Sequence, residues 1–229
     1  MSQYLIVGGT QGIGRALVDM LVSQGHEVHV WARNAVVIPG ALVYSCDITD
    51  QAASLPEIPA PLDGVVYCPG SINLKPFSRL SPEDFLQDLH INLLGAVRAL
   101  QAAHKSLKQS PQSSVVLFSS VAANCGMPYH ASIAAAKGAV EGLTRSLAAE
   151  WAPAIRVNAI APSLTLTPLA DKLISSAEKR ELASKRHPLQ KLGEAEDLAA
   201  MAAFLLSPAA RWMTGQVVHV DGGLSSIKL

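Results

Sequence analysis

Short apolar runs rich in valine and isoleucine alternate along the chain with longer stretches whose apolar residues recur at helical spacing. Such runs are typical of strands buried on both faces, so the alternation predicts an α/β fold, a doubly wound parallel sheet in three α/β/α layers. The expected strands are Tyr4–Val7, Glu27–Trp31, Ala41–Ser45, Gly64–Cys68, Ser114–Ser119, Arg156–Ile160 and Val217–Val220. The expected helices are Gly12–Gln24, Pro82–Leu107, Ser132–Glu150, Ala177–Lys185 and Glu196–Leu206.

No repeat and no linker-like stretch divides this pattern, so we expect a single domain over residues 1–229. Two connections, Asn34–Gly40 and Leu55–Leu62, are too short and too rich in proline or glycine for full helices. Ser81 and Pro82 open the longest helical stretch, where a serine N-cap followed by proline is favoured. The early crossovers of the sheet are therefore expected to be loops.

The charges balance, with 18 Lys and Arg against 18 Asp and Glu, and no basic run that would indicate nucleic-acid binding. The longest apolar run, Leu198–Leu206, is far shorter than the ~20 residues that span a bilayer, and no charged segment precedes Tyr4 as in a secretory signal. The three cysteines are too few and too scattered for a disulfide framework or a zinc site. We expect a soluble, cytoplasmic protein with no metal and no membrane or nucleic-acid partner.

The first expected strand runs into a glycine-rich turn, Gly8-Gly9-Thr10-Gln11-Gly12-Ile13-Gly14, which opens a helix. Glycines let the backbone approach a pyrophosphate, and the helix N-terminus meets the phosphate charge, so this turn predicts a Rossmann-type dinucleotide site. An acidic residue at the end of the second strand would bind the ribose 2′-hydroxyl of NAD. Arg33 stands there instead, which suits a 2′-phosphate and favours NADP(H).

With these features the chain resembles the short-chain dehydrogenase/reductase family from Tyr4 to Gly223. The glycine turn is similar to the family's TGxxxGxG motif, with Val7 in place of the threonine. The segment Tyr67-Cys68-Pro69-Gly70 lies at the family's NNAG position and keeps only the glycine. Two further segments, 155–162 and 214–223, also match, although Ser163 follows the first where glycine is usual.

The resemblance implies cofactor-binding residues along the whole chain. Asp47 and Ile48 would lie against the adenine, Lys137 would bind the nicotinamide ribose, and Thr167 would lie near the nicotinamide. The full implied set is Gly8, Thr10, Gln11, Gly12, Ile13, Gly14, Arg33, Asn34, Asp47, Ile48, Cys68, Gly70, Asn92, Lys137, Pro162, Thr165 and Thr167.

The resemblance also implies catalytic residues, and one of them is replaced. Asn92 would hold a proton-relay water, Ser120 would be the catalytic serine, and Lys137 would lower the pKa of a tyrosine four residues before it. Isoleucine occupies that position, as Ile133, and it can neither donate nor accept a proton. Tyr129 is eight residues before Lys137, too far for a simple shift of register.

Three replacements for the missing phenol stay open. His130 would share a helix face with Ile133 and Lys137 if the helix extended to it, although it is as well explained as the start of that helix. Tyr129 is a second candidate. A third possibility uses Ser120, Asn92, Lys137 and water without any replacement.

We therefore expect an NADP(H)-dependent oxidoreductase that transfers hydride between the nicotinamide and a small carbonyl or alcohol substrate, with an altered proton donor. Its catalytic residues would be Ser120, Lys137, Asn92 and His130, and its activity weak or atypical. The alternative is a non-catalytic NADP(H)-binding sensor or scaffold. The resemblance further implies a homodimer or homotetramer.

Overall fold

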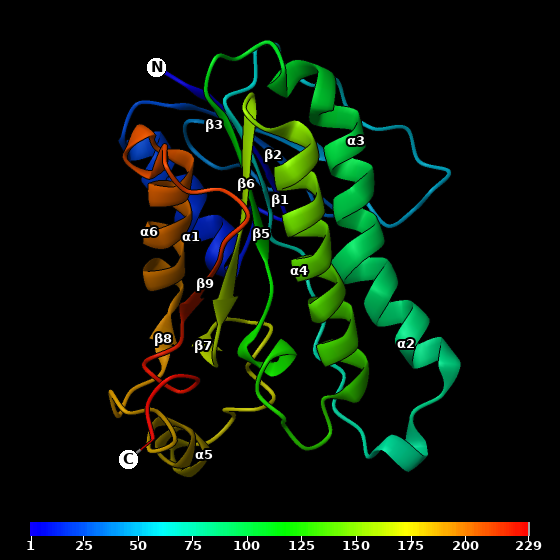
Figure 1. Cartoon of the computed structure of the whole chain (residues 1–229), viewed down its shortest axis with the longest axis vertical. Helices are drawn as coiled ribbons and strands as arrows, with labels where there is room; N and C mark the ends of the chain where they lie inside the picture. Colours follow the sequence, from blue (N-terminus) through cyan, green and yellow to red (C-terminus); the bar gives the residue numbers. More distant parts are fainter. Residues whose placement is uncertain (229) are drawn as a thin grey trace.

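Seven strands form one parallel sheet in the order β3-β2-β1-β4-β5-β6-β9, in a computed structural model that describes residues 1–228 (Figure 1). Their bounds are β1 Gln3–Val7, β2 Glu27–Ala32, β3 Ala41–Ser45, β4 Gly64–Tyr67, β5 Ser113–Phe118, β6 Ile155–Pro162 and β9 Val217–Val220. Every residue of β4 and β5 is buried, as expected for central strands covered on both faces. The predicted sheet is confirmed.

Helices cover both faces of the sheet. On one face lie α1 (Gly12–Ser23) and α6 (Ala195–Leu206), and on the other lie α3 (Gly95–Leu107) and α4 (Ala131–Trp151), with α2 (Pro82–Leu89) leading into α3 (Figure 1). Each side has its own buried apolar cluster against the sheet. None of the helices in the described chain is long and apolar enough to span a membrane.

The helix expected over residues 82–107 is divided. It begins as predicted, with Ser81 as N-cap and Pro82 in the first turn, and Asp84 completes a capping box. A π-helical turn, η2 (His90–Leu94), then separates α2 from α3. Single π-helical turns inside helices are frequent at functional sites, and Asn92 lies within this one.

The early crossovers are loops, as predicted, because no helix connects β2 to β3 or β3 to β4. Three short 3-10 turns, η1 (Phe77–Arg79), η3 (Val121–Ala123) and η4 (Pro208–Ala210), and a second sheet were not predicted. In that second sheet β7 (Thr165–Leu166) pairs in parallel with β8 (Gly193–Glu194), and the segment between them carries α5 (Ala177–Ser184).

The strand order reverses between β1 and β4, whose neighbours lie on opposite sides of the sheet. In doubly wound folds a ligand binds at such a point, beyond the carboxyl ends of the strands. The arrowheads in Figure 1 point toward the end of the molecule where α5 and the β7–β8 pair lie. The site is therefore expected between these elements and the sheet.

Candidate functional site

The turn between β1 and α1 has the close glycine packing that a phosphate site at a helix N-terminus requires. Gly8 has a φ of 79°, which favours glycine, and a methyl group on Gly14 would overlap the carbonyl oxygen of Gly8. Gln11 is the N-cap of α1 but makes no side-chain capping bond, and the first turn of the helix holds no acidic residue. The first N–H groups of α1 are thus available to an anion, so the residues present fit a dinucleotide.

The ends of β2 and β3 form the next part of the site. Arg33 and Asn34 are exposed just after β2, and Arg33 forms no ion pair among the described residues. After β3, Asp47 accepts hydrogen bonds from the backbone N–H and the hydroxyl of Thr49, at 2.9 and 2.6 Å. These bonds lower the pKa of Asp47 despite its partial burial, with a smaller contribution from Arg33. Ile48 beside it is buried.

A cavity of about 550 Å³ opens at the carboxyl ends of β4, β5 and β6. Its lining is mostly apolar, and it brings together nine of the residues predicted from the sequence: Ile13, Cys68, Gly70, Ser120, His130, Lys137, Pro162, Thr165 and Thr167. Thr167 also approaches the glycine turn, because a Cβ on Gly12 would lie 3.4 Å from its side chain. The cavity and the glycine turn are therefore adjacent.

Lys137 is the buried cation of the cavity. Its ammonium donates a hydrogen bond to the carbonyl oxygen of Phe118 at 2.8 Å, and the residue is 8% exposed. Burial lowers the pKa of Lys137 to about 8, and Asp88 and Cys68 oppose that shift. Burial also raises the pKa of the Cys68 thiol to about 12, which nearby Lys137 partly offsets. The lining thiol is therefore neutral at physiological pH.

Three side chains around Lys137 decide what the cavity can do chemically. The Ser120 hydroxyl oxygen accepts a hydrogen bond from the backbone N–H of Ala122 at 3.2 Å. Ile133 is 5% exposed and lines the cavity one helical turn before Lys137. His130 is the N-cap residue of α4, and its Nδ1 lies 2.7 Å from the carbonyl oxygen of Pro128. Because that oxygen can only accept, Nδ1 carries a proton, and Nε2 is the ring nitrogen left for another partner.

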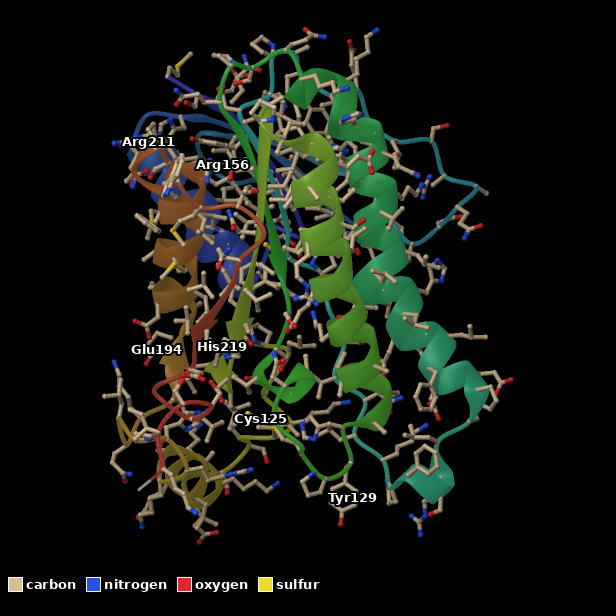
Figure 2. All side chains as sticks on the ribbon, in the orientation of Figure 1. Cys125, Tyr129, Arg156, Glu194, Arg211 and His219 are labelled. Carbon is tan, nitrogen blue, oxygen red and sulfur yellow. The ribbon has the colours of Figure 1, made fainter. Side chains whose placement is uncertain are left out.

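Tyr129 lies outside the cavity. Its φ is 70°, its side chain is 59% exposed, and its ring points away from the molecule at the tip of the loop before α4 (Figure 2). It is not among the residues that line the cavity. The phenol nearest in sequence to Lys137 therefore does not reach the cavity.

Asn92 lies behind the cavity wall and does not line it. Its amide nitrogen donates to the Ser71 hydroxyl and to the Asp88 carbonyl oxygen, both at 2.8 Å, while its Oδ1 is buried with no partner. Ser71 lines the cavity and donates to Asp88 Oδ1 at 2.6 Å. Neither Ser71 nor Asp88 was expected from the sequence. The available signal was the spacing of Asp88 and Asn92, four residues apart on one helix face.

A serine and a histidine connect β6 to the segment that carries α5. The hydroxyl oxygen of Ser163 lies 2.8 Å from His187 Nε2, and His187 Nδ1 lies 2.9 Å from the carbonyl oxygen of Ala183. Both residues line the cavity, and His187 is buried. This connection, which the sequence analysis also missed, anchors one wall of the cavity to the sheet.

Comparisons with known proteins agree with this geometry. A family model described as enoyl-(acyl carrier protein) reductase matches residues 7–225. Two tropinone reductase homologs of Arabidopsis thaliana are 37% and 35% identical over 240 and 241 residues, spanning 96% of this chain and 92% and 91% of their own. The ligand-free aldohexose dehydrogenase of Thermoplasma acidophilum superposes with a TM-score of 0.88 at 26% identity, covering 100% of this chain and 96% of its own.

A second solved structure, ElxO with NADP bound, has a TM-score of 0.87 at 27% identity and covers 99% of both chains. These likenesses extend over nearly the whole chain and agree with the strand order and the glycine turn. The chain belongs to the short-chain dehydrogenase/reductase family of oxidoreductases, which use nicotinamide dinucleotides.

Proposed function

We propose that the protein is an NADP(H)-dependent oxidoreductase that interconverts a small carbonyl compound and its alcohol. The observation that carries the proposal is the cavity itself, which places Ser120 and the buried ammonium of Lys137 beside the glycine turn. A bound nicotinamide dinucleotide supplies or accepts the hydride. We place the whole site in a single dinucleotide-binding domain over residues 1–229.

The preference for NADP(H) rests on Arg33. It is exposed at the end of β2 and makes no ion pair among residues 1–228, so its guanidinium is free for a 2′-phosphate. No carboxylate occupies the same place to bind a ribose 2′-hydroxyl. ElxO binds NADP, and its variant with a tyrosine replaced by phenylalanine binds NADPH.

The other proposed cofactor contacts follow the chain from β1 to β7. Gly8, Gly12 and Gly14, with Thr10, Gln11 and Ile13, would surround the pyrophosphate, while Asn34, Asp47 and Ile48 would contact the adenosine. Lys137 would hold the nicotinamide ribose, and the residues around the nicotinamide would be Cys68, Gly70, Pro162, Thr165 and Thr167. Asn92, which lies behind the cavity wall, would act on the cofactor from there.

The chain's own groups act on the substrate oxygen. We place Ile133 at the family's tyrosine position, thirteen residues after Ser120 and four before Lys137, so the proton donor is altered. The Ser120 hydroxyl keeps its proton free to donate to a substrate oxygen, because its hydrogen bond to Ala122 uses only a lone pair. His130 lines the same cavity and is a candidate donor beside it. The mostly apolar lining favours an uncharged substrate.

The test is turnover of NADPH with a panel of uncharged ketones and aldehydes, and of NADP⁺ with the matching alcohols. The protein is expected to turn over at least one pair, to prefer NADPH over NADH, and to lose that preference in Arg33→Glu. The activity of His130→Ala in the same assay decides whether the imidazole takes part in proton transfer. Tight NADPH binding without turnover of any substrate would refute the proposed activity.

Ile133 also favours a second candidate function, a non-catalytic NADP(H)-binding sensor or scaffold. A site without its phenol retains cofactor binding while losing a group worth about 10²–10⁴-fold in rate. The variant Ile133→Tyr separates the two functions. Turnover that appears only in Ile133→Tyr supports the binding protein, and turnover in the unaltered chain supports the enzyme.

A further inference from the structure

A buried carboxylate lies behind the cavity wall, and the proposed function leaves it without a role. Asp88 is 1% exposed, and its Oδ2 is buried with no hydrogen-bond partner. Leaving a buried polar atom unpaired lowers the stability of the folded protein, and more so when the group is charged. Helix α2 packs against α4, so Asp88 is placed on the side of the cavity that holds Lys137.

One hydroxyl connects this carboxylate to the cavity. Ser71 lines the cavity and donates its proton to Asp88 Oδ1 at 2.6 Å. Its oxygen accepts from Asn92 Nδ2 at 2.8 Å, which leaves one lone pair for a group in the cavity. Ser71 is thus oriented to accept a proton from the cavity and to pass its own to Asp88.

The Lys137 ammonium and the Asn92 amide lie beside the same stretch of backbone as Ser71. A Cβ on Gly70 would lie 3.3 Å from Asn92 Oδ1 and 3.6 Å from Lys137 Nζ, so both atoms border the backbone next to Ser71. Asn92 Oδ1, like Asp88 Oδ2, is a buried acceptor without a partner. Lys137 uses one of its three protons on Phe118. Unpaired acceptors and an ammonium with spare donors therefore meet at this wall.

We propose that Ser71 and Asp88 are the proton path of this enzyme and take the place of the missing phenol, a proposal that rests on the proposed function. In alcohol oxidation the substrate hydroxyl passes its proton to Ser71 Oγ, and Ser71 passes its own to Asp88 Oδ1. The electron pair of the broken O–H bond forms the carbonyl, and the carbon loses its hydrogen as hydride to the oxidised nicotinamide dinucleotide. In reduction the hydride enters the carbon, and the Asp88 carboxylic acid returns the proton through Ser71.

Kinetics of single variants test the path. Ser71→Ala and Asp88→Asn are each expected to lower kcat about 100-fold or more, the range of general acid–base catalysis, with NADPH affinity and far-ultraviolet circular dichroism unchanged. Ser71→Thr keeps the hydroxyl and is expected to restore activity. The matched controls Ser78→Ala and Asp171→Asn remove an exposed hydroxyl and an exposed carboxylate and are expected to keep full activity.

A second measurement does not depend on turnover. The groups that face Lys137 are Asp88 from α2 and Cys68 after β4, with Glu141 one turn along its own helix. Removing the charge in Asp88→Asn is expected to lower the pKa of Lys137, whereas Asp171→Asn is expected to leave that pKa unchanged. NMR of labelled lysine measures the pKa in both variants. An unchanged Lys137 pKa in Asp88→Asn would overturn the placement of the carboxylate.

The possible failures are distinguishable. Full activity in Ser71→Ala and Asp88→Asn, with loss in His130→Ala, would overturn the path and leave the proposed function standing. Absence of turnover in the unaltered protein would overturn both. A loss in Asp88→Asn that is accompanied by an equal loss of NADPH affinity would assign the carboxylate a structural role and overturn its role in proton transfer.

Discussion

Burial of the Lys137 ammonium in the cavity lowers the stability of the folded protein. The pKa of Lys137 falls to about 8 from an ordinary value of 10.5, first because of burial. The unfolded chain therefore holds this proton more tightly than the folded protein does. The folded state is penalised at every pH below about 8, and the penalty disappears as the pH rises toward 10.5.

The direction of this pKa shift predicts how the stability of wild type and of Lys137→Met differs with pH. Between pH 8 and 10.5 the wild-type protein is expected to gain up to about 3 kcal/mol of unfolding free energy relative to the variant, since the variant lacks the titrating group. Urea unfolding across this range measures the difference. Lys172→Met, which changes an exposed lysine, is the control. A constant difference between wild type and Lys137→Met would contradict the prediction.

At the residue scale the sequence predicted the cavity better than it predicted the proton path. Motif spacing identified Ser120, His130 and Lys137, and all three line one cavity. Ser71 and Asp88 carry no motif, and Asp88 lies in a polar stretch that is typical of a solvated helix face. Its burial depends on the packing of α2 against α4, which a one-dimensional pattern does not contain.

At the scale of elements, the turn between β1 and α1 is a close contact between two backbone segments. Gly14 lies in the first turn of α1 and packs directly on the carbonyl of Gly8. Any side chain at Gly14 has to push the helix away from the strand. Because the helix N-terminus is also the proposed phosphate site, the cofactor would lose its donors together with the packing.

We therefore expect Gly14→Ala to weaken NADPH binding at least tenfold, measured by the fluorescence of the bound dihydronicotinamide. The control is Gly126→Ala, because a Cβ at Gly126 meets nothing within 4 Å. Unchanged NADPH affinity in Gly14→Ala would show that the turn does not hold the pyrophosphate. An equal loss of NADPH affinity in Gly126→Ala would show that the effect comes from general destabilisation.

The strands and helices lie where the apolar pattern predicts them, within two residues at each end. Two of the unpredicted features escaped prediction for clear physical reasons. The β7–β8 pair has two residues in each strand, too few to show any periodicity. The η2 turn interrupts a helical pattern that is continuous in sequence, and the bond from Asn92 to the Asp88 carbonyl crosses from that turn into α2.

At the scale of the whole molecule, the outer surface of α4 is available for a second copy of the chain. We propose, from the resemblance to the family, that α4 takes part in a homodimer or homotetramer. Gly138 and Gly142 lie one turn apart on α4, and a Cβ at either position would meet nothing within 4 Å. Small residues at such a surface allow two helices to approach closely.

Gly142→Arg is accordingly expected to shift the protein toward a monomer without unfolding it, as measured by sedimentation velocity and circular dichroism. Ser23→Arg, on the exposed side of α1 across the sheet, is the control and is expected to keep the wild-type mass. A wild-type monomer, or an unchanged mass in Gly142→Arg, would exclude α4 as the interface.

The short β7–β8 pair has a consequence for how this protein can change over time. Thr165 pairs with Gly193, so the chain leaves and re-enters the body of the protein at the same point. Lengthening a loop whose two ends lie together costs little free energy, about 0.6 kcal/mol for each doubling of the loop length. The segment that carries α5 forms one wall of the cavity, and its exchange leaves the sheet and Lys137 in place. New substrate preferences can therefore arise by replacing most of one segment, provided that Thr167 at its start is kept, while the glycine turn and Lys137 stay unchanged.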